Sequence, residues 1–234
     1  MNTKNNHYTL DNVYIAIPLY NEEQVLNDVI SDLQKNFSNI VVVDDGSKDR
    51  SNKLLRELDV TLITHAVNLG QGAAIKTAFE YITTIDEAFA IVTFDADGQH
   101  STEDAVKFAK EIIRCKEDII LGSRFIENAD HVPRLKRILL KSATLVTNFL
   151  IGVHLTDTHN GLKALKVKAV KKLDLDISGS AFESQLIMQV SKYKISVKEI
   201  ATKITYTKYS MKKGQSMRNS LLIAEDIIKL VRSK

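Results

Sequence analysis

Short runs of consecutive apolar residues alternate with longer amphipathic segments through the first half of the chain. Apolar runs of this kind are typical of strands that are covered on both faces, and a 3.6-residue apolar period is typical of helices that pack on a sheet. The predicted strands are residues 13–18, 40–44, 60–65, 90–94 and 118–122, and the predicted helices between them are residues 22–36, 71–84 and 102–115. Repeated strand–helix–strand units of this type predict an α/β fold with right-handed crossovers.

The ends of two predicted helices carry local signals. Glu22 and Glu23 fall in the first turn of the helix at 22–36, where acidic side chains complement the helix dipole. The spacing from Ser101 to Asp104 is that of a capping box at the start of the helix at 102–115. These signals support the predicted helix starts.

The second half of the chain has a less regular pattern. It predicts helices at 134–151, 181–193 and 218–232 and, by alternation, a strand at 196–207. The helix at 134–151 is apolar but begins with four basic residues, Arg134, Lys136, Arg137 and Lys141. Because the chain contains no linker, internal repeat or low-complexity stretch, we expect residues 1–234 to form a single domain.

Composition narrows the class of protein. A content of 44% hydrophobic and 26% charged residues, with 9 Gly and 2 Pro, excludes disordered and collagen-like chains. The single cysteine, Cys115, excludes a disulfide framework and a cysteine-based zinc site. No apolar run approaches the roughly 20 residues that span a bilayer, and the N-terminus lacks the apolar stretch of a signal peptide. We therefore expect a cytoplasmic protein.

The charges are distributed unevenly. Residues 1–100 hold 7 Lys and Arg against 15 Asp and Glu, a net charge of −8, while residues 101–234 hold 25 against 14, a net charge of +11. An asymmetry of this kind indicates a polyanionic partner or surface on the basic side.

Acidic residues gather at the ends of predicted strands, where ligands of α/β sheets bind. Asp95 and Asp97 flank Ala96 directly after an apolar strand and precede Gly98, which allows a tight turn. Two such carboxylates suit Mg²⁺ or Mn²⁺, although a solvated acidic turn explains the pattern equally well. Asp44 and Asp45 follow an earlier strand in the same way, and either a base-binding or ribose-binding carboxylate or an ordinary Asx turn fits them.

A glycine-rich turn, residues 68–74, leads into the helix at 71–84. Small residues allow a diphosphate to approach a helix N-terminus, and close packing of the helix on a strand is the alternative explanation. The turn lacks the third glycine of a dinucleotide fingerprint and follows the third strand rather than the first. A Rossmann dehydrogenase is therefore disfavoured.

Four further polar residues are candidates for chemistry. Arg124, after the fifth strand, suits a phosphate or a surface ion pair, and Asp157 suits a base, an acceptor-positioning group or a turn. His100 and His159 do not share the i, i+4 spacing of a zinc-binding helix. Hydrogen-bonding roles are therefore favoured for both histidines.

Five motifs in order resemble those of the family-2 glycosyltransferases of GT-A fold, and the resemblance extends from Ile15 to about Leu230. The similar subgroup is the polyprenyl-phosphate glycosyltransferases, which include dolichol-phosphate mannose synthase. The motifs are Ile17–Glu23, Val43–Asp49, Asn68–Ala74, Asp95–His100 and Gly122–Arg124. Five matches in the right order are far more specific than any one of them.

The resemblance implies a role for each matching residue. It implies a nucleotide pocket lined by Pro18, Tyr20, Glu22, Val43 and Asp45, a sugar-facing segment of Asp95 and Ala96, and a metal site of Asp95, Asp97 and Gln99. It also implies that Asp97, Arg124 and Asp157 serve catalysis, with Arg124 on a phosphate. Acceptor-side motifs are implied at Thr158–Leu165 and Tyr209–Asn219, with Lys213 and Arg218 as phosphate contacts. Residues of about 13–125 would then form the donor and metal part, and residues of about 126–234 the acceptor and membrane-facing part.

The activity implied by the resemblance is an inverting transfer of glucose, N-acetylglucosamine or mannose to a polyprenyl phosphate at the cytoplasmic face of the membrane. The donor would be a UDP- or GDP-linked sugar, the cofactor Mg²⁺ or Mn²⁺, and no nucleic acid would be bound. Many relatives continue into transmembrane helices where this chain stops, which implies a small membrane-protein partner. A homo-oligomer is left open.

Three other functions compete with this one. The same fold acting on a soluble or cell-wall glycan is the first, a sugar-1-phosphate nucleotidyltransferase the second, and a non-enzymatic binding subunit the third. The nucleotidyltransferase would need a basic, glycine-rich loop after the first strand, which residues 20–23 do not provide.

The apolar, basic segments 134–151 and 218–232 suit a membrane surface, although helices that merely cover the sheet have the same pattern.

Overall fold

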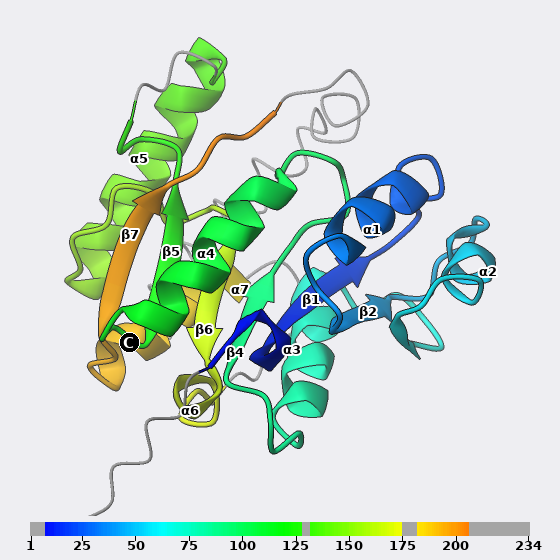
Figure 1. Cartoon of the computed structure of the whole chain (residues 1–234). Coiled ribbons are helices and arrows are strands. Elements are labelled where there is room, and N and C mark those ends of the chain that lie inside the picture. The colour runs from blue at the N-terminus through cyan, green and yellow to red at the C-terminus, as the bar shows by residue number, and fades with distance from the viewer. Residues whose placement is uncertain (1–7, 128–131, 175–181, 206–234) are drawn as a thin grey trace, which may run out of the picture.

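The computed structural model describes residues 8–127, 132–174 and 182–205, in which seven strands form one sheet (Figure 1). The strands are β1 (Val13–Leu19), β2 (Ile40–Asp44), β3 (Thr61–Thr64), β4 (Ala90–Thr93), β5 (Ile119–Ser123), β6 (Lys163–Lys166) and β7 (Val197–Ala201). The helices are η1 (Leu10–Asn12), α1 (Leu26–Gln34), α2 (Ser51–Leu55), α3 (Gln71–Ile82), α4 (Thr102–Arg114), α5 (Arg134–Ile151), α6 (Val167–Val170) and α7 (Phe182–Lys192).

The strand order across the sheet is β3-β2-β1-β4-β6-β5-β7. Strand β1 pairs in parallel with β2 and β4, β2 with β3, and β5 with β7. Strand β6 lies antiparallel between β4 and β5, so that Thr93 on β4 and Leu121 on β5 both oppose Lys163. The sheet is therefore mixed, with one reversed strand between parallel neighbours.

Helices cover both faces of the sheet, as the continuous apolar strands predict. Ile15 and Ile17 of β1 pack with α1, α2 and α4 on one face, whereas Ala16 packs with α3, α6 and α7 on the other. Figure 1 shows α1 and α4 on the near side of the sheet. These two apolar clusters fix the strands from both sides and confirm the α/β class, with helices flanking the sheet.

The predicted elements of the first half are confirmed to within two residues at each end, except for the start of α1. Helix α1 begins at Leu26 rather than at residue 22, because Glu22 and Glu23 belong to the preceding turn. Ser101 caps α4 by accepting a hydrogen bond from the Asp104 amide, as its spacing predicts. The helix at 218–232 and the end of the strand at 196–207 lie outside the described residues.

Strand β6 and the short helices α2 and α6 are absent from the sequence prediction. The sequence of β6, in which Lys163 and Lys166 flank two apolar residues, has neither the alternating nor the continuous apolar pattern of a strand, yet both lysine side chains are buried. The Lys163 ammonium is paired with Glu183, and the Lys166 ammonium donates to the carbonyl oxygens of Cys115 and Lys116. These partners are distant in sequence, so the local pattern does not reveal the strand.

Helix α5 exposes more apolar surface than it buries. Its buried face consists of Leu140, Ala143, Thr144 and Thr147. Its exposed large apolar side chains are Leu135, Ile138, Leu139, Leu145, Val146 and Phe149, with Phe149 85% exposed. Within the described parts of the chain, no helix combines the length and the apolar character needed to cross a membrane.

Candidate active site

The residues predicted to bind ligands or to act in catalysis lie at one edge of the sheet, because the parallel strands β1, β2, β4 and β5 all end there. Asp45 and Arg124 directly follow β2 and β5, and Asp95 follows β4 after one intervening residue. Strand β6 runs in the opposite direction, so the segment that precedes it, residues 157–162, reaches the same edge. The sheet thus brings together residues that are more than 100 positions apart in sequence.

The loops after β1 and β2 are joined by side-chain hydrogen bonds. The Asn21 amide donates to Ser47 Oγ at 2.9 Å, and the Lys48 amide donates to Asn21 Oδ1 at 2.8 Å. The Glu22 amide donates to Ser51 Oγ at 3.0 Å. Asn21 adopts φ of 54°, a value that asparagine tolerates better than most residues. The two loops therefore form one surface beside Asp45.

The predicted nucleotide-pocket residues differ in exposure. Pro18 and Tyr20 are half-buried, whereas Glu22 is buried in the turn before α1. Val43 is fully buried and belongs to the apolar cluster under α3, so its side chain does not reach the loop surface. Ala96 is also buried, 3% exposed. For the described residues, Pro18 and Tyr20 are therefore the accessible part of the predicted set.

Asp45 anchors the glycine-rich turn. Its Oδ1 accepts hydrogen bonds from the Leu69 amide at 2.9 Å and from His65 Nδ1 at 2.7 Å, and its Oδ2 accepts one from the Gly70 amide at 2.7 Å. Gly70 precedes α3 with φ of 96°, a conformation that favours glycine. The turn that leads into α3 is thus held by Asp45, the residue that follows β2.

Asp95 lies against the segment before β6. Its Oδ1 accepts a hydrogen bond from Gln71 Nε2 at 2.9 Å, and its Oδ2 lies 3.6 Å from His100 Nε2. A Cβ at Gly161 would stand 2.0 Å from Asp95 Oδ2, so only glycine fits there without a shift. Burial opposes ionisation, but His100, Lys163 and Gln71 together hold the pKa of Asp95 below its usual range.

The carboxylate of Asp97 accepts hydrogen bonds from Gln99, two residues further along the chain. The Gln99 amide donates to Asp97 Oδ1 at 3.0 Å, and the Gln99 side-chain amide contacts Asp97 Oδ2. Burial, followed by the charge of Asp95, raises the pKa of Asp97. Two neighbouring carboxylates that disfavour each other's charge fit a divalent cation, which would neutralise both.

The protein supplies only part of a coordination shell at this position. Among the described residues, no group of three or more His, Cys, Asp or Glu side chains converges as a metal site. Two carboxylates and an amide oxygen from Gln99 match the usage of Mg²⁺ and Mn²⁺, which take remaining ligands from water and substrate phosphates. The residues present therefore fit a cation that is bound together with a phosphorylated ligand.

Arg124 and Asp157 form a buried ion pair. Arg124 Nε donates to Asp157 Oδ2 at 2.6 Å, Nη2 donates to Oδ1 at 2.7 Å, and Nη2 also donates to the His159 carbonyl at 2.7 Å. Although burial opposes ionisation, Arg124 holds the pKa of Asp157 below its usual range. The guanidinium is thereby fixed in orientation, and Asp157 is a poor proton acceptor.

Near this edge lie Lys136 and Glu183, to which the sequence prediction gave no role, and Lys163, which it included only as part of the motif Thr158–Leu165. Burial, followed by the charge of Arg124, lowers the pKa of Lys136 on α5, and the charge of Asp97 opposes this effect, so both charges act on this ammonium. Lys163 Nζ lies 2.5 Å from Glu183 Oε2 and donates to the Asn160 carbonyl at 2.5 Å. Burial raises the pKa of Glu183. The four basic residues at the start of α5 were the one sequence signal for Lys136.

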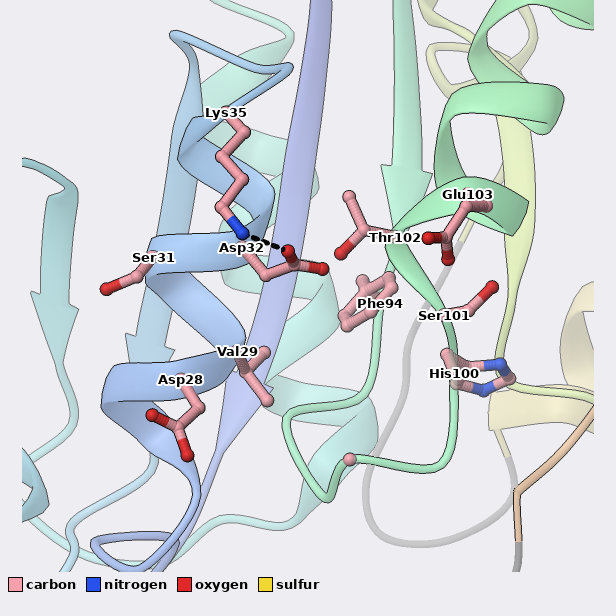
Figure 2. A pocket seen from close by; sticks show the side chains of 11 residues that line it. Asp28, Val29, Ser31, Asp32, Lys35, Phe94, His100, Ser101, Thr102 and Glu103 are labelled. Carbon is pink, nitrogen blue, oxygen red and sulfur yellow. Dashed lines mark hydrogen bonds and ion pairs between the residues drawn. The ribbon is translucent and has the colours of Figure 1, made fainter.

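A hollow of about 540 Å³ lies between α1 and the start of α4 (Figure 2). Asp32 and Lys35 of α1, which form an ion pair at 2.9 Å, line one side, and Ser101 to Glu103 line the other. The hollow shares only Gly98 and His100 with the stretch from Asp95 to His100. It borders this stretch from the α1 side and does not include Arg124 or Asp157.

The seven-stranded mixed sheet with flanking helices, and with acidic and basic residues gathered at the ends of its strands, is of the GT-A type. Residues 14–174 match the glycosyl transferase family 2 profile, and the chain belongs to this family. It is therefore a glycosyltransferase. A UDP-N-acetylglucosamine–dolichyl-phosphate N-acetylglucosaminyltransferase of Methanococcus voltae is 32% identical over 88% of this chain and 90% of its own length.

Two further similarities agree with this membership. An uncharacterized protein of Methanocaldococcus jannaschii is 31% identical over 100% of this chain and 96% of its own length. The structure of glucosyl-3-phosphoglycerate synthase from Mycobacterium tuberculosis in complex with phosphoglyceric acid superposes with a TM-score of 0.71. It is 13% identical over 93% of this chain and 79% of the other, and this similarity supports the fold.

Proposed function

We propose that this glycosyltransferase moves a sugar from a nucleoside diphosphate donor to the phosphate of a polyprenyl lipid, with inversion at the anomeric carbon. The observation that supports the proposal is that Asp95, which lies against Gly161, and Arg124, which donates to the His159 carbonyl, both border the segment before β6. Carboxylates suit a cation on the donor diphosphate, and the basic side chains suit a second anion.

The proposed transfer reaction moves negative charge onto the donor diphosphate, and the charged residues of the site act on that charge. The acceptor phosphate oxygen attacks the anomeric carbon, and the bond from the sugar to the donor diphosphate breaks with its electrons passing to the diphosphate. Asp95, Asp97 and Gln99 would hold Mg²⁺ or Mn²⁺, which stabilises charge on the departing diphosphate when bound. Arg124 and Lys136 stabilise the same negative charge or orient the incoming phosphate.

No strong general base is needed, because a phosphate monoester is largely ionised near neutral pH. We assign to Asp157 the positioning of Arg124 rather than proton transfer, since its carboxylate is bound through both oxygens and its pKa is lowered. For donor binding, we keep Pro18, Tyr20, Glu22 and Asp45 as proposed residues of the nucleotide site.

The lipid acceptor is supported by the relatives. The Methanococcus voltae protein is named for dolichyl phosphate, and a polyprenol monophosphomannose synthase of Mycolicibacterium smegmatis is 27% identical over 88% of this chain and 83% of its own length. The apolar exposed face of α5, which is flanked by Arg134, Arg137 and Lys141, suits the headgroup region of a membrane. We propose peripheral association with the cytoplasmic face of the membrane, with a small membrane protein as partner.

The test is transfer from radiolabelled UDP- and GDP-sugars to polyprenyl phosphate, compared with phosphoglycerate and with oligosaccharides. The expected result is label in the lipid extract alone. Label only in a soluble product would favour the soluble-acceptor alternative, and the absence of transfer and of donor hydrolysis would favour a binding subunit.

A further inference from the structure

The carboxylate of Asp45 is nearly saturated with hydrogen bonds from its own chain. Each carboxylate oxygen accepts about two hydrogen bonds. Oδ1 already accepts from His65 Nδ1 and the Leu69 amide, and Oδ2 accepts from the Gly70 amide. The side chain is 3% exposed, so only a small part of the carboxylate is accessible to a ligand. One acceptor position, on Oδ2, is left.

His65 is held from both sides in the orientation that fills Oδ1. Its Nδ1 lies 2.7 Å from Asp45 Oδ1, and its Nε2 lies 2.9 Å from the Thr77 hydroxyl on α3. A carboxylate only accepts hydrogen bonds, so His65 Nδ1 carries a proton and donates to Asp45, while Nε2 and the Thr77 hydroxyl share a second hydrogen bond. Since the His65 side chain is only 11% exposed, water does not readily replace these contacts.

The two common donor bases differ in the number of hydrogen-bond donors that they offer to a carboxylate. Uracil has a single ring N–H, which lies between two carbonyl acceptors. Guanine presents a ring N–H beside an amino group, and a free carboxylate satisfies both donors with its two oxygens. Filling Oδ1 with His65 and Leu69 removes the second acceptor that guanine needs.

We propose that His65, by occupying Asp45 Oδ1, makes the nucleotide site select uridine over guanosine donors. This inference rests on the proposed function, because it takes Asp45 as a base contact. Asp45 would accept the single uracil N–H, and His65 would act as a positioning residue that does not touch the base. A guanine base would bury its amino group without a partner, which is a costly arrangement.

Binding of UDP and GDP to the wild-type chain, measured by isothermal titration calorimetry with Mg²⁺ and again with Mn²⁺, tests the inference directly. We expect UDP to bind more than tenfold tighter than GDP. Equal affinities, or tighter binding of GDP, would overturn the inference while leaving the proposed transfer intact. No binding of either nucleotide would overturn both the inference and the proposed function.

Two substitutions separate the role of His65 from general packing. In His65→Leu, Oδ1 regains an open acceptor position, and we expect the ratio of GDP to UDP dissociation constants to fall at least fivefold. The matched control His154→Leu replaces an exposed histidine outside the proposed nucleotide site, and the ratio should stay within twofold of wild type. An unchanged ratio in a folded His65→Leu variant would overturn the assignment to His65, and the wild-type comparison tests the base preference even if that variant does not fold.

Discussion

The guanidinium of Arg124 and the carboxylate of Asp157 pair through two parallel hydrogen bonds in a buried position. The pair joins the end of β5 to the segment before β6 across 33 residues of sequence. Two charges buried together compensate each other, whereas one charge left alone in the same place is strongly destabilising. Arg124 therefore keeps Asp157 ionised, and Asp157 fixes the orientation of the Arg124 guanidinium.

Replacing Asp157 by Asn should both destabilise the fold and slow turnover. The buried guanidinium loses its counter-charge, which costs about 3–5 kcal/mol, and Arg124 loses its fixed orientation. Urea unfolding and transfer rates measure the two effects. If Asp157 were instead the general base, the variant would in addition lose the acidic limb of its pH–rate profile, whereas a positioning role leaves the shape of that profile unchanged.

Asp97 and the metal are tested together. Asp97→Ala, or EDTA treatment of the wild type, should lower transfer by roughly 100-fold or more, because stabilisation of the leaving group is lost. Calorimetry should also show weaker Mn²⁺-dependent binding of the nucleotide in the variant. The exposed Asp86→Ala substitution serves as control. Full turnover in EDTA would contradict the metal role.

His159 should make stability depend on pH. Burial lowers its pKa from 6.5 to about 4, so the unfolded chain binds a proton at pH values where the folded chain does not. Stability is therefore complete above pH 6.5 and falls as pH drops toward 4, by up to about 3 kcal/mol. Urea midpoints across this window should fall less steeply in His159→Gln, and parallel curves for the two proteins would contradict the assignment.

At the scale of elements, the segment before β6 links the carboxylate site to α7. Gly161 lies against Asp95, and the next residue but one, Lys163, pairs with Glu183 in the first turn of α7. The Lys163 ammonium also lies 5.6 Å from the centre of the Phe182 ring. Strand β6 and α7 therefore hold this segment against the end of β4.

Gly161→Ala is the sharpest test of this contact. The new methyl group would overlap Asp95 Oδ2, so we expect a loss of about 1–3 kcal/mol in stability and weaker Mn²⁺-dependent UDP binding. The control is Gly152→Ala after α5, which is strained by φ of 74° but has open space around the new methyl group. The control should lose stability without losing affinity. Equal affinity in both variants would contradict the close approach at Asp95.

The extent of successful prediction differs between elements for a physical reason. Strands β1 to β5 are apolar on both faces, and their local pattern is sufficient to place them. Strand β6 is buried through two lysines whose partners lie 20 or about 50 residues away, so no local pattern identifies it. The same limit applies at the site: the sequence places Asp95 and Arg124 at strand ends, but not the pairing of Arg124 with Asp157.

At the scale of the whole molecule, the charge asymmetry of the sequence follows the two proposed substrates. The acidic first 100 residues contain Asp45, Asp95 and Asp97, which we propose to bind the donor and metal. The basic remainder contains α5, whose exposed face combines apolar side chains with arginine and lysine. A negatively charged lipid surface complements the second half and not the first.

The apolar face of α5 should be required for membrane binding. Leu135→Ser combined with Phe149→Ser should lower flotation with anionic liposomes at least about tenfold, since burying one such side chain contributes roughly 1.5–3 kcal/mol. Both side chains are more than 80% exposed, so the fold should tolerate the change. Tyr81→Ser on α3, another exposed site, is the matched control. Unchanged flotation of the double variant would contradict this role of α5.

The reversed direction of β6 has a consequence for how such an enzyme diversifies. The proposed donor groups stand where β1, β2 and β4 end, while the groups proposed to face the acceptor lie in the connection from β5 to β6. Insertions or exchanges in that connection leave the pairing register of β1 to β4 unaltered. Apart from Gly161, which lies against Asp95, residues of this connection can therefore change with the acceptor while the proposed donor groups keep their places.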